Sequence, residues 1–379
     1  MKSCKIWYFT VLVLIALSIS LIVVVNYLID PYNVFKTPTV NGFNLKKIET
    51  KEYLMKAREI VLYKPDIIFL GSSRTRNGLD PSYYFESTGE RAYNCGLSSA
   101  GIYEQMRYLE YALLNNNSLK KVIVGVDFAA FNELKNDNKK FDEKQLNSSF
   151  FAKDDMIRIL LTKQSIKDSI HVLLDNSMNE NKYTANKYLQ NGSANEEEII
   201  LQSEKMMKQG KNRFFEHLKD YLKEEGNYGK FALSKQKISY FEKIISICEE
   251  NSIELTVLIH PAHALQWEGI KKAGLWSEFE EWKKEIVNIY PVWDFSGYNS
   301  ITTSPPDNFI NYTDQSHYRK KIGNYVFNRI LHVNEESIPD DFGVFLTKDN
   351  MQEHLIKIRK EQETWEMNNP DILEKIKDL

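Results

Sequence analysis

The longest apolar segment of the chain lies at its N-terminus. Residues Ile6–Ile29 carry no charged side chain and consist largely of Val, Leu and Ile. A helix rises about 1.5 Å per residue, so this segment covers the roughly 30 Å hydrocarbon core of a bilayer. Trp7, Tyr8 and Tyr27 lie near its ends, where interfacial aromatic residues gather. The pattern predicts a transmembrane anchor over residues 1–29.

A cleaved signal peptide is the alternative interpretation of this segment. Its apolar core would span about 7 to 15 residues and lead into a small-residue cleavage site, and Asn26–Pro31 offers no such pattern. Lys2 and Lys5 precede the segment, although lysines also follow it. By the positive-inside rule we expect a single-pass protein of the cell membrane, with a cytoplasmic N-terminus and an extracytoplasmic main domain.

Behind the anchor, short apolar runs alternate with stretches of helical periodicity. Such alternation indicates an α/β fold with a parallel sheet and helices on both of its faces. The apolar runs predict strands at 66–70, 91–94, 121–126, 255–259 and 290–295. Apolar spacings of three and four predict helices at 103–114, 238–248, 267–289 and 318–331.

Two segments depart from this alternation. Residues 132–235 are rich in Lys, Asn, Glu and Gln and are too long for a simple loop, so we expect a mainly helical insertion that could cover a site. Residues 336–379 are charged and helical in pattern, with Pro370 interrupting them. This tail is expected to form a coiled-coil arm or a helix packed on the domain. The predicted α/β domain therefore covers residues 30–335 with its insertion.

Charge and cysteine content exclude two classes of protein. The chain has 49 basic and 52 acidic residues, a net charge of −3, and no basic stripe, so we expect no nucleic-acid partner. Its three cysteines do not make a disulfide framework. Cys95 and Cys248 lie in apolar segments and are expected to be small core residues.

The first candidate for chemistry is the turn after the first predicted strand. Residues 71–76 read Gly-Ser-Ser-Arg-Thr-Arg. A strand that turns into a helix here would project a hydroxyl at the carboxyl edge of the sheet, where open α/β sheets bind ligands. The N–H groups of the helix N-terminus would stabilise a developing oxyanion. An ordinary loop turn is the alternative.

The second candidate follows the last predicted strand. Asp314 and His317 lie three residues apart in Tyr312–Tyr318, close enough for the carboxylate to fix the imidazole tautomer while the other ring nitrogen takes a proton from a serine. The alternative is that Asp314 caps a helix near Tyr318 and His317 lies at the surface.

Together, Gly71-Ser72-Ser73 and the pair Asp314 and His317 resemble the SGNH/GDSL hydrolase family. The likeness is closer to membrane-anchored cell-envelope members, the alginate O-acetyltransferase-like proteins and the protein that transfers D-alanine in teichoic-acid modification. It covers roughly residues 66–331. The resemblance implies a flavodoxin-like sheet, Ser73 as the nucleophile, with Ser72 where Asp commonly stands, and Asp314 and His317 as its partners. No cofactor is expected.

The resemblance also indicates where the oxyanion donors should lie. A backbone N–H in Asn94–Ser99 should serve, with the register pointing to Gly96 or Ser99. A further family donor is an Asn side chain, at the position where this chain has Asp127. An ionised carboxylate would repel an oxyanion, so this donor is lost, protonated or replaced. Arg74 would recognise an anionic or polyhydroxylated substrate, pair with Asp127, or lie in a solvated helical turn.

The remaining histidines are expected to have other roles. His260 and His263 follow a strand, but two histidines without Cys or carboxylate partners at ligand spacing do not make a metal site. We expect them to line the same sheet edge, and we expect no metal. The histidines predicted to lie at the surface are His171, His217, His332 and His354.

These features predict acyl transfer through an acyl-serine. The acyl group would pass to water or to a hydroxyl of a cell-surface polysaccharide or related envelope polymer, and the resemblance implies a membrane-bound acyl donor protein as a partner. The alternative is a non-catalytic envelope protein that keeps the α/β fold for glycan binding or assembly.

Overall fold

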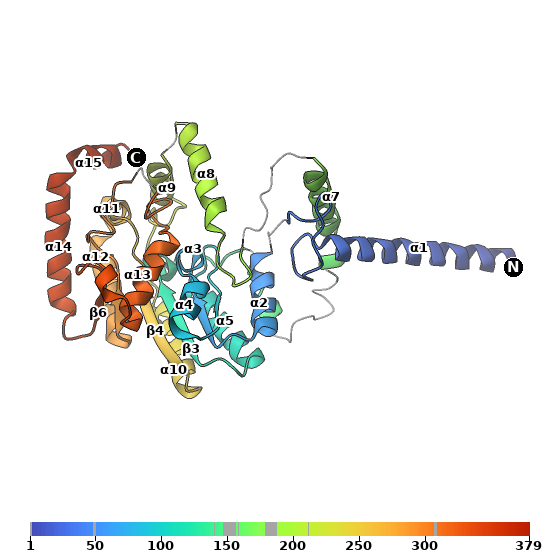
Figure 1. Ribbon diagram of the computed structural model, residues 1–379, viewed down its shortest axis with the longest axis horizontal. Helices are drawn as coiled ribbons and strands as arrows, with labels where there is room; N and C mark the ends of the chain where they lie inside the picture. The colour runs from blue at the N-terminus through green and yellow to red at the C-terminus, as the bar shows by residue number, and fades with distance from the viewer. Residues whose placement is uncertain are drawn as a thin grey trace. The chain divides into compact units, whose positions relative to one another are not determined.

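The computed structural model shows a chain that divides into two compact units (Figure 1). The first unit comprises residues 1–61 and 142–187, and the second comprises residues 62–141 and 188–379. The predicted insertion is therefore shared between the units, whereas the predicted tail lies within the second. The residues that the structure describes are 2–47, 51–139, 141–146, 157, 159–178, 188–210, 212–306 and 309–379, so parts of the predicted insertion lie outside them.

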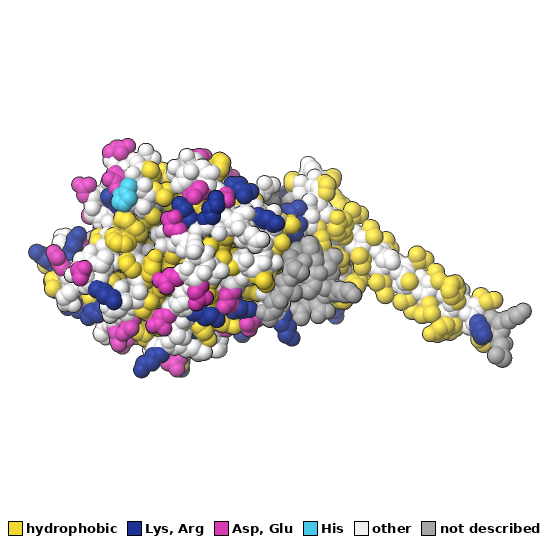
Figure 2. Space-filling model, turned by 90° about the horizontal axis from the view of Figure 1, so that it is seen from below, with side chains coloured by type: hydrophobic (Ala, Val, Ile, Leu, Met, Phe, Trp, Pro, Cys, Tyr) yellow, Lys and Arg dark blue, Asp and Glu magenta, His cyan; other side chains and the backbone are white. Residues whose placement is uncertain are grey.

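The first unit begins with α1 (Lys2–Ile29), one long uninterrupted helix (Figure 1). Among the described residues this is the one helix long and apolar enough to cross a membrane, over Cys4–Ile29. Figure 2 shows hydrophobic side chains along most of the visible face of α1, with a basic side chain near its N-terminal end. The predicted apolar N-terminal helix is thus present. The other helices that the structure describes in this unit are η2 (Glu143–Leu146), α7 (Lys163–Ser177) and most of α2 (Glu52–Tyr63), which ends two residues beyond the unit's boundary.

The second unit is built on a six-stranded sheet in the order β2-β1-β3-β4-β5-β6. The first five strands run parallel, and β6 pairs antiparallel with β5. This confirms the predicted mixed α/β class with a mostly parallel sheet. The strands are β1 (Ile67–Leu70), β2 (Ala92–Asn94), β3 (Lys121–Val126), β4 (Glu254–Ile259), β5 (Val292–Asp294) and β6 (Val344–Leu346).

Helices pack on the sheet through side chains that alternate along the strands. Phe69 of β1 contacts Tyr84 of α4 (Pro81–Thr88) and Phe327 of α13 (Lys320–Leu331). Because successive strand residues point to opposite faces, the neighbours of Phe69 point away from these two helices. Helices α5 (Ile102–Asn115) and α10 (Lys235–Glu250) pack against each other, and they contact β1 and β4 respectively.

Two of the predicted elements differ from the structure. The single helix expected at 267–289 is two helices, α11 (Ala264–Lys272) and α12 (Trp276–Ile289). Gly274 lies between them with φ +73°, a conformation that glycine adopts readily and that ends a helix. We predicted β5 as the last strand. The sheet continues with β6, which was not predicted.

The predicted tail is part of the second unit. It contributes β6 to the sheet, then α14 (Met351–Asn368) and α15 (Pro370–Lys377), with Pro370 as the first residue of the final helix. His354 of α14 is buried, and its Nε2 lies 2.9 Å from Asp294 Oδ2. Lys283 Nζ donates to the same oxygen at 2.6 Å. Of the two forms expected for the tail, the structure shows a helix packed on the domain. The prediction that His354 lies at the surface was wrong.

Candidate active site

The carboxyl ends of three neighbouring strands bring polar residues to one edge of the sheet. Ser73 follows β1, Asp127 directly follows β3, and His260 directly follows β4. These strands are parallel, so their carboxyl ends meet at the same edge. The strand order changes direction between β1 and β3, and open parallel sheets form their ligand crevices at such a point.

Gly71 makes the turn that leads from β1 to Ser73. Its φ is +153°, and a β-carbon at this position would lie 2.0 Å from Thr75 Oγ1, so only glycine fits. Helix α3 (Ser73–Gly78) begins at once, with the Ser72 hydroxyl accepting from the Arg74 N–H at 3.2 Å. A first helical residue has no N–H partner within its helix, so α3 does not use the Ser73 N–H.

The loop before α13 folds back on itself at residues 312–318. Tyr312 and Tyr318 pair as an antiparallel bridge, and the Thr313 N–H donates to the His317 carbonyl at 2.9 Å. These contacts close a tight loop, and residues 312–318 are all buried. The loop therefore holds His317 in one place.

The Asp314 carboxylate organises the inside of this loop. Its Oδ1 accepts hydrogen bonds from the backbone N–H groups of Ser316 and His317, both at 2.9 Å, as aspartates commonly do in turns. It does not cap α13, which begins at Lys320 with Arg319 at the N-cap. The helix-cap alternative for Asp314 is therefore wrong, and its carboxylate faces the loop.

Ser73, His317 and Asp314 form a chain of hydrogen bonds. Ser73 Oγ lies 2.7 Å from His317 Nε2, and His317 Nδ1 lies 2.8 and 2.9 Å from the two Asp314 oxygens. With the ring hydrogen on Nδ1 donated to Asp314, Nε2 is left to accept the serine proton. Asp314 is fully buried, His317 is 8% exposed and Ser73 is half-buried. The structure thus brings together three residues that lie up to 244 positions apart in the chain.

The electrostatics of this group suit His317 as a base. Burial lowers the pKa of His317, and the Asp314 carboxylate offsets only part of that effect, so the imidazole is neutral at pH 7. Burial would raise the pKa of Asp314, but His317 and His217 outweigh it and hold that pKa well below the usual range. Asp314 therefore stays ionised and can stabilise an imidazolium when His317 takes a proton.

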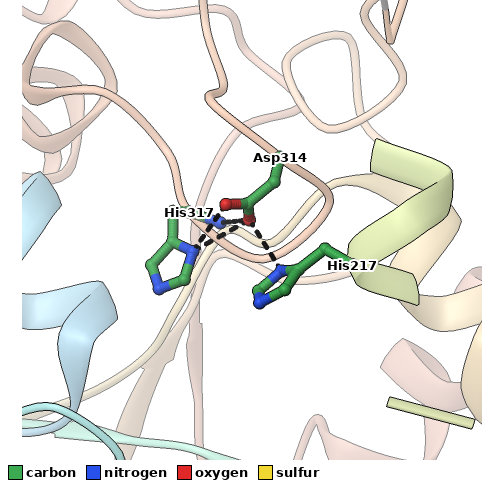
Figure 3. Close-up of side chains that lie close together, drawn as sticks. All are labelled: His217, Asp314 and His317. Carbon is green, nitrogen blue, oxygen red and sulfur yellow. Dashed lines mark hydrogen bonds and ion pairs between the residues drawn. The ribbon is translucent and has the colours of Figure 1, made fainter. Parts of the chain in front are cut away.

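Helix α9 (Arg213–Leu222) completes the surroundings of Asp314. Arg213 Nε lies 3.3 Å from Asp314 Oδ2, and His217 Nδ1 lies 3.4 Å from Asp314 Oδ1. Figure 3 shows His217 and His317 on two sides of the Asp314 carboxylate, with ring centroids 5.6 Å apart. Tyr221 OH lies 3.1 Å from Ser316 Oγ. His217 is 30% exposed, so the surface prediction holds in part, but the side chain also contacts Asp314. This helix of the predicted insertion covers the loop.

His217, Asp314 and His317 also offer three metal-ligand atoms within 4.8 Å of one another. The two histidines and the carboxylate are suitable donors. However, the Arg213 guanidinium already lies against Asp314, and its charge opposes a second cation there. His317 Nε2 is also engaged with Ser73. The arrangement therefore suits proton transfer better than metal binding.

Arg74 and Asp127 form a buried ion pair beneath the site. Their side chains are 7% and 5% exposed, and Arg74 Nη1 donates to Asp127 Oδ1. Arg74 also donates to the Ser316 carbonyl at 3.2 Å and to Gln266 Oε1 at 2.7 Å. Burial opposes the charge of Asp127, but Arg74 and His260 hold its pKa below the usual value. Of the alternatives for Arg74, the structure shows the ion pair with Asp127. The charge of Arg74 neutralises the ionised Asp127 carboxylate.

The predicted donors Gly96 and Ser99 lie in the loop after β2. A β-carbon on Gly96 would lie 2.4 Å from the Arg76 nitrogen, so this glycine lets the loop pack closely on α3. Its N–H donates to Asn94 Oδ1 at 2.9 Å. This hydrogen bond engages the N–H group that would otherwise hold an oxyanion. Ser99 is exposed, with φ +57°. In this conformation the Ser73 N–H, rather than the Gly96 N–H, is suited to hold an oxyanion.

His260 and His263 lie at the predicted sheet edge with separate partners. His260 Nε2 lies 3.1 Å from Thr75 Oγ1, and its Nδ1 lies 2.9 Å from Tyr318 OH. His263 accepts from the Leu265 N–H at 3.1 Å and caps α11. Burial lowers the pKa of each to about 4. Both are therefore neutral side chains that join loops around the site.

A surface cleft of about 460 Å³ lies at α9 and the preceding helix α8 (Glu196–Lys208). Arg213 and His217 line it and also contact Asp314, so the cleft opens beside the site. The other lining residues are Lys205, Met206, Gln209, Glu216 and Asp220.

Replacing His217 by glutamine is expected to move the acid limb of the rate profile to higher pH. The Asp314 carboxylate outweighs burial and raises the pKa of His217, and the charge of His217 in turn lowers the pKa of His317. Without that charge the pKa of His317 rises, so the base is protonated, and the rate falls, at a higher pH. Ester hydrolysis measured from pH 4 to 8 tests this. His332→Gln, at a side chain 69% exposed, is the control, and equal acid limbs in both variants would contradict the prediction.

No protein-family model matches this chain, and a search of curated proteins found no match. The family resemblance of Ser73, Asp314 and His317 therefore stays a prediction, and the function is argued from the geometry of the site.

Proposed function

We propose that this chain is a membrane-anchored serine acyl hydrolase or O-acyltransferase. The observation that carries the proposal is the hydrogen-bonded series Ser73 Oγ, His317 Nε2 and Nδ1, and the Asp314 carboxylate, with distances of 2.7 and 2.8 Å. A nucleophile within reach of a base, which is oriented by a third group, is the arrangement that activates a serine.

In the first half-reaction Ser73 Oγ attacks the carbonyl carbon of an acyl ester. His317 Nε2 accepts the hydroxyl proton, and Asp314 stabilises the resulting imidazolium. The backbone N–H of Ser73 stabilises the negative charge on the carbonyl oxygen. When the tetrahedral intermediate collapses, the ester C–O bond breaks and His317 gives its proton to the departing alcohol. The acyl group is then an ester of Ser73.

In the second half-reaction an acceptor hydroxyl takes the acyl group. His317 removes the acceptor proton, the new C–O bond forms, and the bond to Ser73 breaks, with the proton returning to Ser73. Water as acceptor makes the protein an esterase, and a polymer hydroxyl makes it a transferase. The Arg74–Asp127 pair supports both half-reactions, because it removes the net negative charge that would oppose an oxyanion.

The strand order and the anchor support a function in the cell envelope. The order 2-1-3-4-5 is that of flavodoxin-like sheets, which agrees with the likeness to SGNH/GDSL hydrolases. The apolar helix over Cys4–Ile29 would place the site on the extracytoplasmic side. The proposed acceptor is a cell-surface polysaccharide or related envelope polymer, and the proposed partner is a membrane-bound acyl donor protein.

A fluorophosphonate probe tests the proposal, since it modifies activated serines. The full-length protein in detergent should be labelled, and peptide mass spectrometry should locate the label on Ser73. Protein denatured by heat before the probe is added is the control and should not react. Labelling at another serine, or none on folded protein, would contradict the proposal and favour a non-catalytic glycan-binding or assembly role.

A further inference from the structure

Helix α7 is fixed against the end of the apolar helix α1 (Figure 1). Ile29 of α1 and Val172 of α7 form a small buried core. Tyr32, which follows α1, donates its hydroxyl hydrogen to Asp168 Oδ2 at 2.6 Å. These contacts set α7 alongside the last turns of α1, although the two helices lie far apart in the sequence.

Polar side chains at the end of α1 donate to backbone carbonyls. Asn26 is 2% exposed and donates to the Leu160 carbonyl at 2.7 Å. Lys47 Nζ donates to the Ile29 carbonyl at 2.6 Å. At about 1.5 Å per residue, roughly 20 residues from the N-terminal end of the span cross the hydrocarbon core. The last turns of α1, and α7 beside them, therefore fall at the boundary between acyl chains and headgroups.

One face of α7 exposes a row of large apolar side chains. Ile170 and Leu174 of α7, and Met178 directly after it, are 51%, 47% and 53% exposed. A spacing of four residues places them on one side of a helix. Lys163 and Lys167, seven and three residues before Ile170, are exposed at the N-terminal end of the same side, where their long side chains can extend to the headgroups. The exposed Gln164 and the partly exposed His171 and Asp175 lie on another side of α7, so this helix separates apolar from polar residues as helices of a membrane interface do.

The apolar row of α7 continues into a groove that it shares with α1. The groove has a volume of about 210 Å³, and its walls include Leu21 and Val25 of α1 and Ile166, Ile170 and Leu173 of α7. Leu21 is 64% exposed. Ile170 belongs to both the groove and the exposed row, so the apolar surface runs without interruption from the membrane helix onto α7.

We infer that α7 is an interfacial helix, inserted at the outer boundary of the bilayer that α1 spans, with Ile170, Leu174 and Met178 among lipid acyl chains and one such chain filling the α1–α7 groove. The occupant is lipid because the groove is continuous with a surface that, in the proposed function, already faces acyl chains. The inference rests on that anchoring. It assigns this part of the predicted insertion to the membrane, whereas α9 of the same insertion covers the site.

Depth-dependent quenching in vesicles tests the inference. The full-length protein, with Cys4→Ser to remove its exposed thiol, is given one bimane-labelled cysteine and reconstituted into phosphatidylcholine vesicles with brominated acyl chains. The labelled positions are Leu174→Cys on the apolar row, Gln164→Cys as the control on the same helix, about 120° around it from Ile170, and Leu17→Cys within α1, where the side chain is 60% exposed. The other two cysteines, Cys95 and Cys248, are buried and therefore stay in place.

The label at position 174 should lose fluorescence to brominated lipid to an extent comparable with position 17, and the label at 164 should respond to aqueous iodide instead. Ile170→Cys is a second variant in case Leu174→Cys does not fold. If the labels at 174 and 170 behave like that at 164 while position 17 is quenched by lipid, the inference is wrong and the anchor stands. If position 17 is not quenched by lipid either, both the anchor and the inference fail.

Discussion

Ser73→Ala is expected to lower the rate of ester hydrolysis by roughly 10⁴- to 10⁶-fold, because it removes the oxygen that forms the acyl intermediate. The geometry predicts this for Ser73 alone, since its Oγ lies 2.7 Å from His317 Nε2. The fold should survive, because the half-buried side chain makes no contact that closes α3. Hydrolysis of a small chromogenic ester, together with circular dichroism of both proteins, measures the effect.

Ser72→Ala is the matched control for this variant. Ser72 has the same chemistry at the adjacent position, but its hydroxyl accepts from the Arg74 N–H and caps α3. Losing that cap should cost about 0.5–2 kcal/mol of stability and leave hydrolysis within roughly tenfold of the wild type. If the two variants lose activity equally, Ser73 is not the nucleophile.

Arg74→Met should lower the free energy of unfolding by about 3–5 kcal/mol, because it leaves the buried Asp127 carboxylate without its partner. The variant also removes the hydrogen bonds to the Ser316 carbonyl and to Gln266. Ser316 belongs to the loop that carries Asp314 and His317, so we expect activity to fall with stability. Denaturation by guanidinium chloride in detergent, followed by far-ultraviolet circular dichroism, measures the loss.

The double variant Arg74→Met with Asp127→Leu separates charge from packing. Replacing both members of a buried ion pair by apolar residues is often neutral or stabilising, so most of the lost stability should return. Activity should recover less, since the bond from Arg74 to Ser316 is still absent. A double variant as unstable as Arg74→Met alone would show that the unpaired Asp127 charge is not the cause.

The sequence was informative where the pattern is local. The apolar run at 66–70 and the one at 121–126 became β1 and β3, with the second reproduced residue for residue. Ser73 and the pair Asp314 and His317 were found because each motif follows a strand at the carboxyl edge of a parallel sheet. Topology then brings such positions together whatever lies between them.

The contribution of α9 could not be predicted, because it depends on how an insertion folds over the sheet edge. Arg213, His217 and Tyr221 are spaced four residues apart, next to the buried Phe214 and Leu218, so one face could have been recognised. Nothing local shows that this face meets Asp314. The segment is polar enough to suggest a solvent-exposed helix. Its tertiary contacts instead place α9 against the loop that carries Asp314.

The missed strand and the role of Arg74 have the same origin. β6 has three residues, and it is a strand only because β5 offers it an antiparallel edge. Whether Arg74 faces solvent or Asp127 depends on the approach of α3 to the end of β3, which spacing alone leaves open. Both outcomes follow from packing between segments rather than from their own composition.

The most direct test of the central claim is to find the acyl group on the enzyme. The full-length protein is mixed with an acyl ester and quenched in acid within the first turnover, and its peptides are analysed by mass spectrometry. The account predicts one acyl group on the peptide that carries Ser73, formed before product is released in the second step and lost when a hydroxyl acceptor is added. Ester turnover with the acyl group on no residue, or on a residue other than Ser73, would contradict it.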